Sequence, residues 1–74
     1  MIDLATPKGI RRSVPIFAWA INRGAIGYTE AFDLLMSAFF RTSNISSDKK
    51  LLQAEYQLHT RLTHYIGLYE GMTE

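Results

Sequence analysis

The sequence predicts an all-α fold: a small three-helix domain with two short apolar helices and one long amphipathic C-terminal helix. Apolar residues recur at helical spacing in three blocks, and segments rich in glycine or serine separate these blocks. Hydrophobic residues make up 47% of the chain and charged residues 20%, which is the balance of a globular protein. Since 74 residues are near the lower limit for one hydrophobic core, we expect a single domain over residues 1–74.

The first predicted helix covers residues 14–23, with Ser13 as its N-cap. Serine is a favourable N-cap, and Pro15 is tolerated in a first turn because its missing N–H would be unpaired there. The segment is apolar on nearly every side, and its alanines favour a helix, although a buried strand has the same pattern. Residues 1–12 are then either a basic arm or a short extra turn capped at Thr6.

The second predicted helix runs from about Tyr28 to Arg41, after a connector bounded by Gly24 and Gly27. Glu30 in its first turn and Arg41 in its last both interact favourably with the helix dipole. Apolar side chains cover roughly 240° of its circumference. The remaining polar stripe consists of Glu30, Asp33, Ser37 and Arg41. This helix must therefore be covered on most of its sides.

The third predicted helix runs from about Asp48 to Glu70, and a serine of the preceding loop, residues 42–47, acts as its N-cap. Such a helix is on the order of 35 Å long, and Gly71 is its expected stop. The main apolar stripe consists of Leu51, Ala54, Leu58, Leu62, Tyr65 and Tyr69. A weaker second seam lies about 100° away from it on the helix. This seam consists of Leu52, Tyr56, His59, Thr63 and Ile66.

The apolar surface of the first two helices exceeds what the single stripe of the third can cover, so a lone copy would leave aromatic rings in water. Burying one Phe or Leu side chain is worth about 1.5–3 kcal/mol, and a few exposed positions would therefore favour association. We expect a homodimer, joined either through the second helix or through the second seam of the third. The candidate interface residues are Trp19, Phe32, Met36, Phe39, Phe40, Leu52 and Tyr56. For any single one of them, ordinary core is the competing interpretation.

We predict that the chain is not an enzyme and that it binds no cofactor or metal. His59 and His64 are five positions apart, which turns a helix by about 140° and points the two rings to different sides. Glu55 and His59 have the i, i+4 spacing of a surface pair, but a zinc site would need two further ligands. The serines lie mainly in cap and loop positions, without a Gly-x-Ser-x-Gly elbow.

Positive charge is concentrated at the N-terminal end, although the formal net charge is only +1. Residues 1–27 hold four cations against Asp3 alone, a balance of +3. The predicted partner-binding residues are these four: Lys8, Arg11, Arg12 and Arg23. Such a cluster suits an acidic patch on a protein or the phosphates of nucleic acid, and a solvated basic arm is the third interpretation. Residues 13–41 resemble a DNA-binding helix-turn-helix in outline, but the second helix would present two carboxylates and only one cation to a DNA groove. The phosphates would repel these carboxylates.

The expected function is that of a small protein–protein interaction module, which acts as adaptor, regulator or inhibitor of a larger protein. Its size and class are typical of regulators from phages and mobile elements. One alternative is an oligomeric nucleic-acid-binding protein that uses the N-terminal basic segment, and another is a structural subunit or assembly chaperone. We expect a cytoplasmic location without membrane contact, because cysteine is absent and no apolar run approaches the roughly 20 residues of a membrane span.

Overall fold

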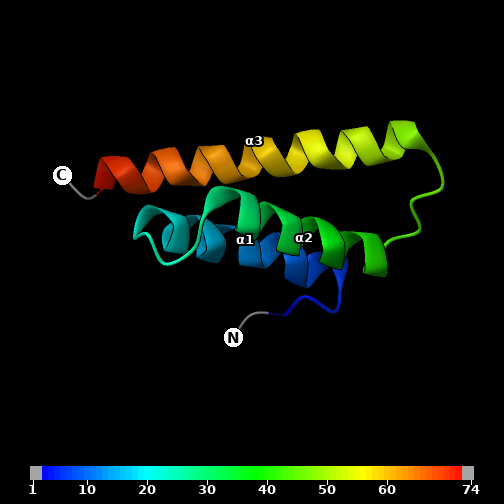
Figure 1. The fold of residues 1–74 in the computed structure, drawn as a ribbon, viewed down its shortest axis with the longest axis horizontal. Coiled ribbons are helices and arrows are strands. Elements are labelled where there is room, and N and C mark those ends of the chain that lie inside the picture. The colour runs from blue at the N-terminus through cyan, green and yellow to red at the C-terminus, as the bar shows by residue number, and fades with distance from the viewer. Residues whose placement is uncertain (1–2, 73–74) are drawn as a thin grey trace.

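The computed structural model describes residues 3–72, which form three helices and no strand. The helices are α1 (Pro7–Asn22), α2 (Tyr28–Thr42) and α3 (Asp48–Met72). Successive helices run in opposite directions, so that α1 and α2 form an antiparallel hairpin and α3 lies along it (Figure 1). α1 contacts α3 most extensively, whereas α2 and α3 contact each other least. The predicted all-α, three-helix fold is confirmed.

The start of α1 differs from the prediction, and the assignment of Ser13 as its N-cap is wrong. Thr6 caps the helix: its Oγ1 accepts a hydrogen bond from the Gly9 N–H at 3.0 Å. Pro7 occupies the first helical position, where a missing N–H removes no helical hydrogen bond. Ser13 instead lies buried inside α1, and its Oγ donates to the Ile10 carbonyl at 2.7 Å.

Pro15 consequently stands in the interior of α1 and not in its first turn. It has no N–H to donate to the Arg11 carbonyl one turn earlier, which costs about 3 kcal/mol or more in a helix interior. The helix continues because side chains on both sides of Pro15 are buried in the core: Ile10, Val14, Phe17 and Ala18. Of the two alternatives for residues 1–12, the arm is wrong from Pro7 onward, because these residues are helical. The alternative of a turn capped at Thr6 has the correct cap, but this turn continues as α1 and is not a separate element. Residues 1 and 2 lie outside those described.

α1 ends where the sequence predicts, at a glycine turn. Gly24 has a φ of 77°, in the left-handed region that glycine enters without a Cβ penalty. Its N–H donates to the Ile21 carbonyl at 3.0 Å, and the Ala25 N–H donates to the Ala20 carbonyl at 2.9 Å. These two bonds form a Schellman motif, which satisfies carbonyls that the helix end would leave unpaired.

α2 and α3 occupy their predicted positions within a few residues. The four side chains of the predicted polar stripe of α2 are all exposed. The main stripe of α3 faces inward, since Ala54, Leu58 and Leu62 are buried and its outer members are half-buried. α3 continues through Gly71 to Met72, so the predicted stop at this glycine is wrong.

One core lies between the three helices. Its buried members are Ile10, Val14, Phe17, Ala18, Ala31, Leu35, Ala38, Leu58 and Leu62. Ala18, Ala31 and Ala38 are fully buried, and their small side chains let the helix backbones approach closely. Other large apolar side chains stay exposed: Ile16, Trp19, Leu34, Phe40, Leu52, Tyr56, Leu68 and Met72. No helix within residues 3–72 is long and apolar enough to cross a membrane.

Candidate partner-binding surface

The outer face of α1 carries a row of cationic and apolar side chains, which we call the α1 stripe. Its members are Lys8, Arg12, Ile16, Trp19 and Arg23, and all five are exposed. Their spacing of three or four residues places them within roughly 80° of the helix circumference. The stripe exists because α1 is capped at Thr6 and begins at Pro7, since an arm ending at Ser13 would not hold Lys8 and Arg12 in line with Trp19.

Trp19 is the central apolar group of the α1 stripe. Its side chain is 50% exposed. The Arg23 guanidinium lies over the indole, 4.6 Å from the ring centroid, which is a cation–π contact between residues one helical turn apart. This contact holds a flat aromatic ring and a cation together on the surface. Arg and Trp are the residue types most enriched where protein interfaces bind tightly.

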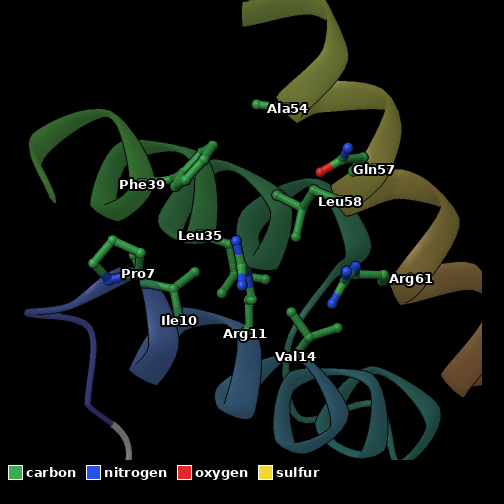
Figure 2. Close-up of a pocket in the computed structure, with 10 residues that line it drawn as sticks. All are labelled: Pro7, Ile10, Arg11, Val14, Leu35, Phe39, Ala54, Gln57, Leu58 and Arg61. Atoms are coloured by element: carbon green, nitrogen blue, oxygen red, sulfur yellow. The ribbon is translucent and has the colours of Figure 1, made fainter. Parts of the chain in front are cut away.

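Arg11, the fourth predicted partner-binding residue, lies outside the α1 stripe and lines a groove between α1 and α3. The groove encloses about 50 Å³. Its aliphatic lining includes Ile10, Val14, Leu35, Ala54 and Leu58. Figure 2 shows Arg11 rising from α1 and Arg61 reaching from α3 toward the same space, with Gln57 one turn before Arg61.

The groove carries unbalanced positive charge. No acidic residue lines it, and within the part of the chain that is described neither Arg11 nor Arg61 has an ion-pair or hydrogen-bond partner. The sequence pattern does not single out Arg61 and Gln57 as partner-binding residues. On a helical wheel of α3 both positions flank the buried stripe at Leu58 and Leu62, which indicates that they lie at the edge of a helix–helix contact. The pattern within α3 does not show that this contact brings them close to Arg11.

The seven predicted interface residues divide into two groups. Trp19, Phe40, Leu52 and Tyr56 are exposed, the last two by 64% and 74% of their surface. Phe32, Met36 and Phe39 are half-buried and pack against the core, in agreement with the competing core interpretation. Leu52 and Tyr56 lie one turn apart on α3 and form the largest apolar contribution of its second seam.

His59, which the sequence places on the second seam, connects α3 to α2. Its Nδ1 shares a hydrogen bond of 2.6 Å with the Tyr28 Oη, and its ring stacks on Phe32 with centroids 3.9 Å apart. Tyr28, and not Glu55, is therefore its hydrogen-bond partner. Burial raises the pKa of the Tyr28 phenol above its ordinary value. Among residues 3–72 no group of three His, Asp or Glu side chains is placed to hold a metal ion.

No family model, curated protein or solved structure matches this chain. Its own side chains are therefore the guide to what it binds. The α1 stripe offers cations beside an exposed indole, and the groove offers two guanidinium groups, neither of them paired within residues 3–72, above aliphatic side chains. Both combinations suit a partner that presents carboxylates next to apolar groups.

Proposed function

We propose that the chain is a protein–protein interaction module that binds an acidic surface of a larger protein through α1 and acts as its adaptor, regulator or inhibitor. The observation that carries this proposal is the α1 stripe, in which three cations flank an exposed tryptophan on one helix face. Charge complementarity accelerates encounter and selects acidic partners, while an apolar anchor contributes affinity. The proposed setting is the cytoplasm, a prediction from the cysteine-free composition alone.

The dimensions of the α1 stripe support a helix-face interface. From Lys8 to Arg23 the stripe is about 22 Å long at 1.5 Å per residue. A helix face of this length suits a standard-sized interface, which buries roughly 800 Å² on each partner. The apolar groups stand at the centre of the row and the cations toward its ends. This order resembles the general arrangement of an apolar interface core within a polar rim.

We also propose that the chain forms a homodimer through the exposed part of the second seam on α3. Leu52 and Tyr56 present adjacent apolar side chains, and Phe40 is exposed at the C-terminal end of α2. Two copies related by a two-fold axis would cover both seams in one symmetric contact. Sedimentation of the wild-type chain and of Leu52→Lys tests this proposal: we expect a dimer and a monomer, respectively. A monomeric wild type at high micromolar concentration would refute it.

Nucleic-acid binding is the second candidate, and the observation that favours it is the alignment of Lys8, Arg12 and Arg23 beside an indole on which a base can stack. We rank it lower because the net charge is only +1 and the stripe offers no Asn or Gln to base edges. Mobility shifts with random duplex and single-stranded DNA at two salt concentrations separate the candidates. Binding that weakens steeply with salt would favour nucleic acid.

The protein-binding proposal is tested with a photo-crosslinking residue in place of Ile16, at the centre of the α1 stripe, in cells of the native host. Mass spectrometry identifies the crosslinked protein, and titration calorimetry with that purified protein measures binding of variants. We expect Trp19→Ala to weaken binding by roughly 2 kcal/mol or more, the loss typical of a hot spot. Arg12→Glu should weaken it through charge reversal. Lys50→Glu, an exposed reversal on α3, is the matched control.

The outcome is decided by comparing these variants. Weaker binding by Trp19→Ala and Arg12→Glu, with Lys50→Glu unchanged, is the expected result. If all three variants bind the crosslinked protein as tightly as the wild type does, the α1 stripe is not the interface and the proposal is wrong. Circular dichroism of each variant checks that the helices are intact.

A further inference from the structure

The groove between α1 and α3 brings two exposed cations to one opening. Arg11 and Arg61 approach the same space from different helices (Figure 2), and within residues 3–72 neither has a counter-charge. Two guanidinium groups turned toward one opening raise each other's electrostatic energy. An anion bound between them would remove this repulsion and accept charge-assisted hydrogen bonds from both.

The lining of the groove adds an apolar requirement. Beneath the two arginines lie the aliphatic side chains of Val14, Leu35 and Leu58, which belong to the core and are only 2%, 0% and 8% exposed. The enclosed space is about 50 Å³. An apolar cavity that holds benzene measures about 150 Å³, so a space of about 50 Å³ admits the end of an aliphatic side chain and not a whole ring. The ligand must therefore combine a carboxylate or similar anion with a small aliphatic side chain.

From this geometry we propose that the groove binds an acidic, aliphatic segment of a partner protein, with Asp or Glu carboxylates at Arg11 and Arg61 and a Val, Ile or Leu side chain on the floor. The proposal rests on the protein-binding function and assigns the chemistry of the partner. A segment with several carboxylates fits better than a single free carboxylate, because two guanidinium groups line the groove and Lys8 lies one turn before Arg11 on α1.

The probe is a capped hexapeptide of alternating glutamate and leucine. Titration is followed by NMR through the methyl signals of Val14, Leu35 and Leu58. One matched peptide replaces glutamate with glutamine and removes the charge, and another replaces leucine with serine and removes the aliphatic groups. N-acetyl-leucine supplies a single carboxylate on one aliphatic residue. We expect the glutamate–leucine peptide to shift the groove methyls and each of the other three probes to bind more weakly.

Two variants remove the cations, and a third neutralises one of them. Arg11→Gln and Arg61→Gln should each weaken peptide binding by up to about fivefold, and together by up to about thirtyfold, if each exposed ion pair contributes at the upper end of its range. Gln57→Glu places a carboxylate one turn before Arg61, which pairs with this arginine at i, i+4 and repels the peptide without disturbing the helix. Arg41→Gln, on the exposed face of α2, is the matched control.

The proposal is overturned if the glutamine peptide, the serine peptide or N-acetyl-leucine binds as tightly as the glutamate–leucine peptide, or if the double variant binds this peptide as tightly as the wild type does. Shifts confined to Ile16 and Trp19 would overturn it as well, while leaving the α1 stripe as the interface of the proposed function. Failure of the proposed function itself is detected separately, because it depends on Trp19→Ala and the crosslinked protein and not on this probe.

Discussion

Replacing Pro15 with alanine tests the most unexpected element of the fold, the proline in the interior of α1. Alanine restores the N–H at this position, which can donate to the Arg11 carbonyl. It also removes the clash between the pyrrolidine ring and that carbonyl. The helix on both sides of Pro15 is already held by buried side chains, among them Val14 and Phe17. The substitution should therefore strengthen an existing helix.

The expected gain follows from two opposing contributions. Alanine is about 3 kcal/mol more favourable than proline in a helix interior. Pro15 is half-buried, and the two ring carbons that alanine lacks would be worth about 0.8 kcal/mol each if fully buried, hence about half of that here. The free energy of unfolding should rise by about 2 kcal/mol. For a domain of this size the melting temperature should rise by roughly 10 °C.

Urea denaturation followed by circular dichroism at 25 °C measures this change, with the slope of the transition as a check on two-state behaviour. An unchanged slope and a higher midpoint are expected. A lower midpoint for Pro15→Ala would refute the reasoning, because it would mean that the proline favours the helix as a first-turn residue. The helix would then begin at Ser13, and the groove lining from Pro7 to Arg11 would not be formed.

Two further predictions concern the N-cap of α1 and the contact between Tyr28 of α2 and His59 of α3. Thr6→Ala should lower the free energy of unfolding by about 1 kcal/mol, because it removes the N-cap hydrogen bond, and Ser13→Ala should lower it less. Urea denaturation measures both changes. A larger loss of stability for Ser13→Ala than for Thr6→Ala would indicate that Ser13 is the cap. Burial raises the pKa of Tyr28 in the folded state above the ordinary value of 10.0. The neutral phenol therefore contributes stability below pH 10, and this contribution is lost as the pH rises through the folded-state pKa. The stability difference between wild type and Tyr28→Phe should therefore shrink in alkaline solution, and a difference that stays constant with pH would contradict the assignment.

The sequence predicted α2 and α3 because their signals are local. A glycine connector, a serine-rich loop and one apolar stripe per helix lie within a few residues of the structure they specify. α1 was predicted incorrectly at its start because two N-cap patterns compete, Thr6 with Pro7 and Ser13 with Pro15. Local rules favour the second pattern, which keeps Pro15 out of a helix interior. Burial of Ile10 against the other helices outweighs this local cost, and no local rule contains that contact.

The candidate site was predicted in part for the same reason. The concentration of cations near the N-terminus is visible in composition, and three of the four lie on one face once α1 is extended to Pro7. Arg11 and Arg61 line the same groove because of the way α3 lies along α1. The contact between Tyr28 and His59 likewise depends on how α3 packs against α2. Such pairs are far apart in the sequence, and helical spacing within one element does not reveal them.

The position of Pro15 also bears on how the groove binds its ligand. The groove residues contributed by α1, from Pro7 to Val14, all precede Pro15 and lie on the N-terminal side of the missing helical hydrogen bond. A ligand that bridges Arg11 and Arg61 would stabilise this part by binding only when it is helical. Apparent affinity scales with the fraction of molecules in the binding-competent state. Pro15→Ala should therefore bind the glutamate–leucine peptide at least as tightly as the wild type, and weaker binding would mean that the proline shapes the groove itself.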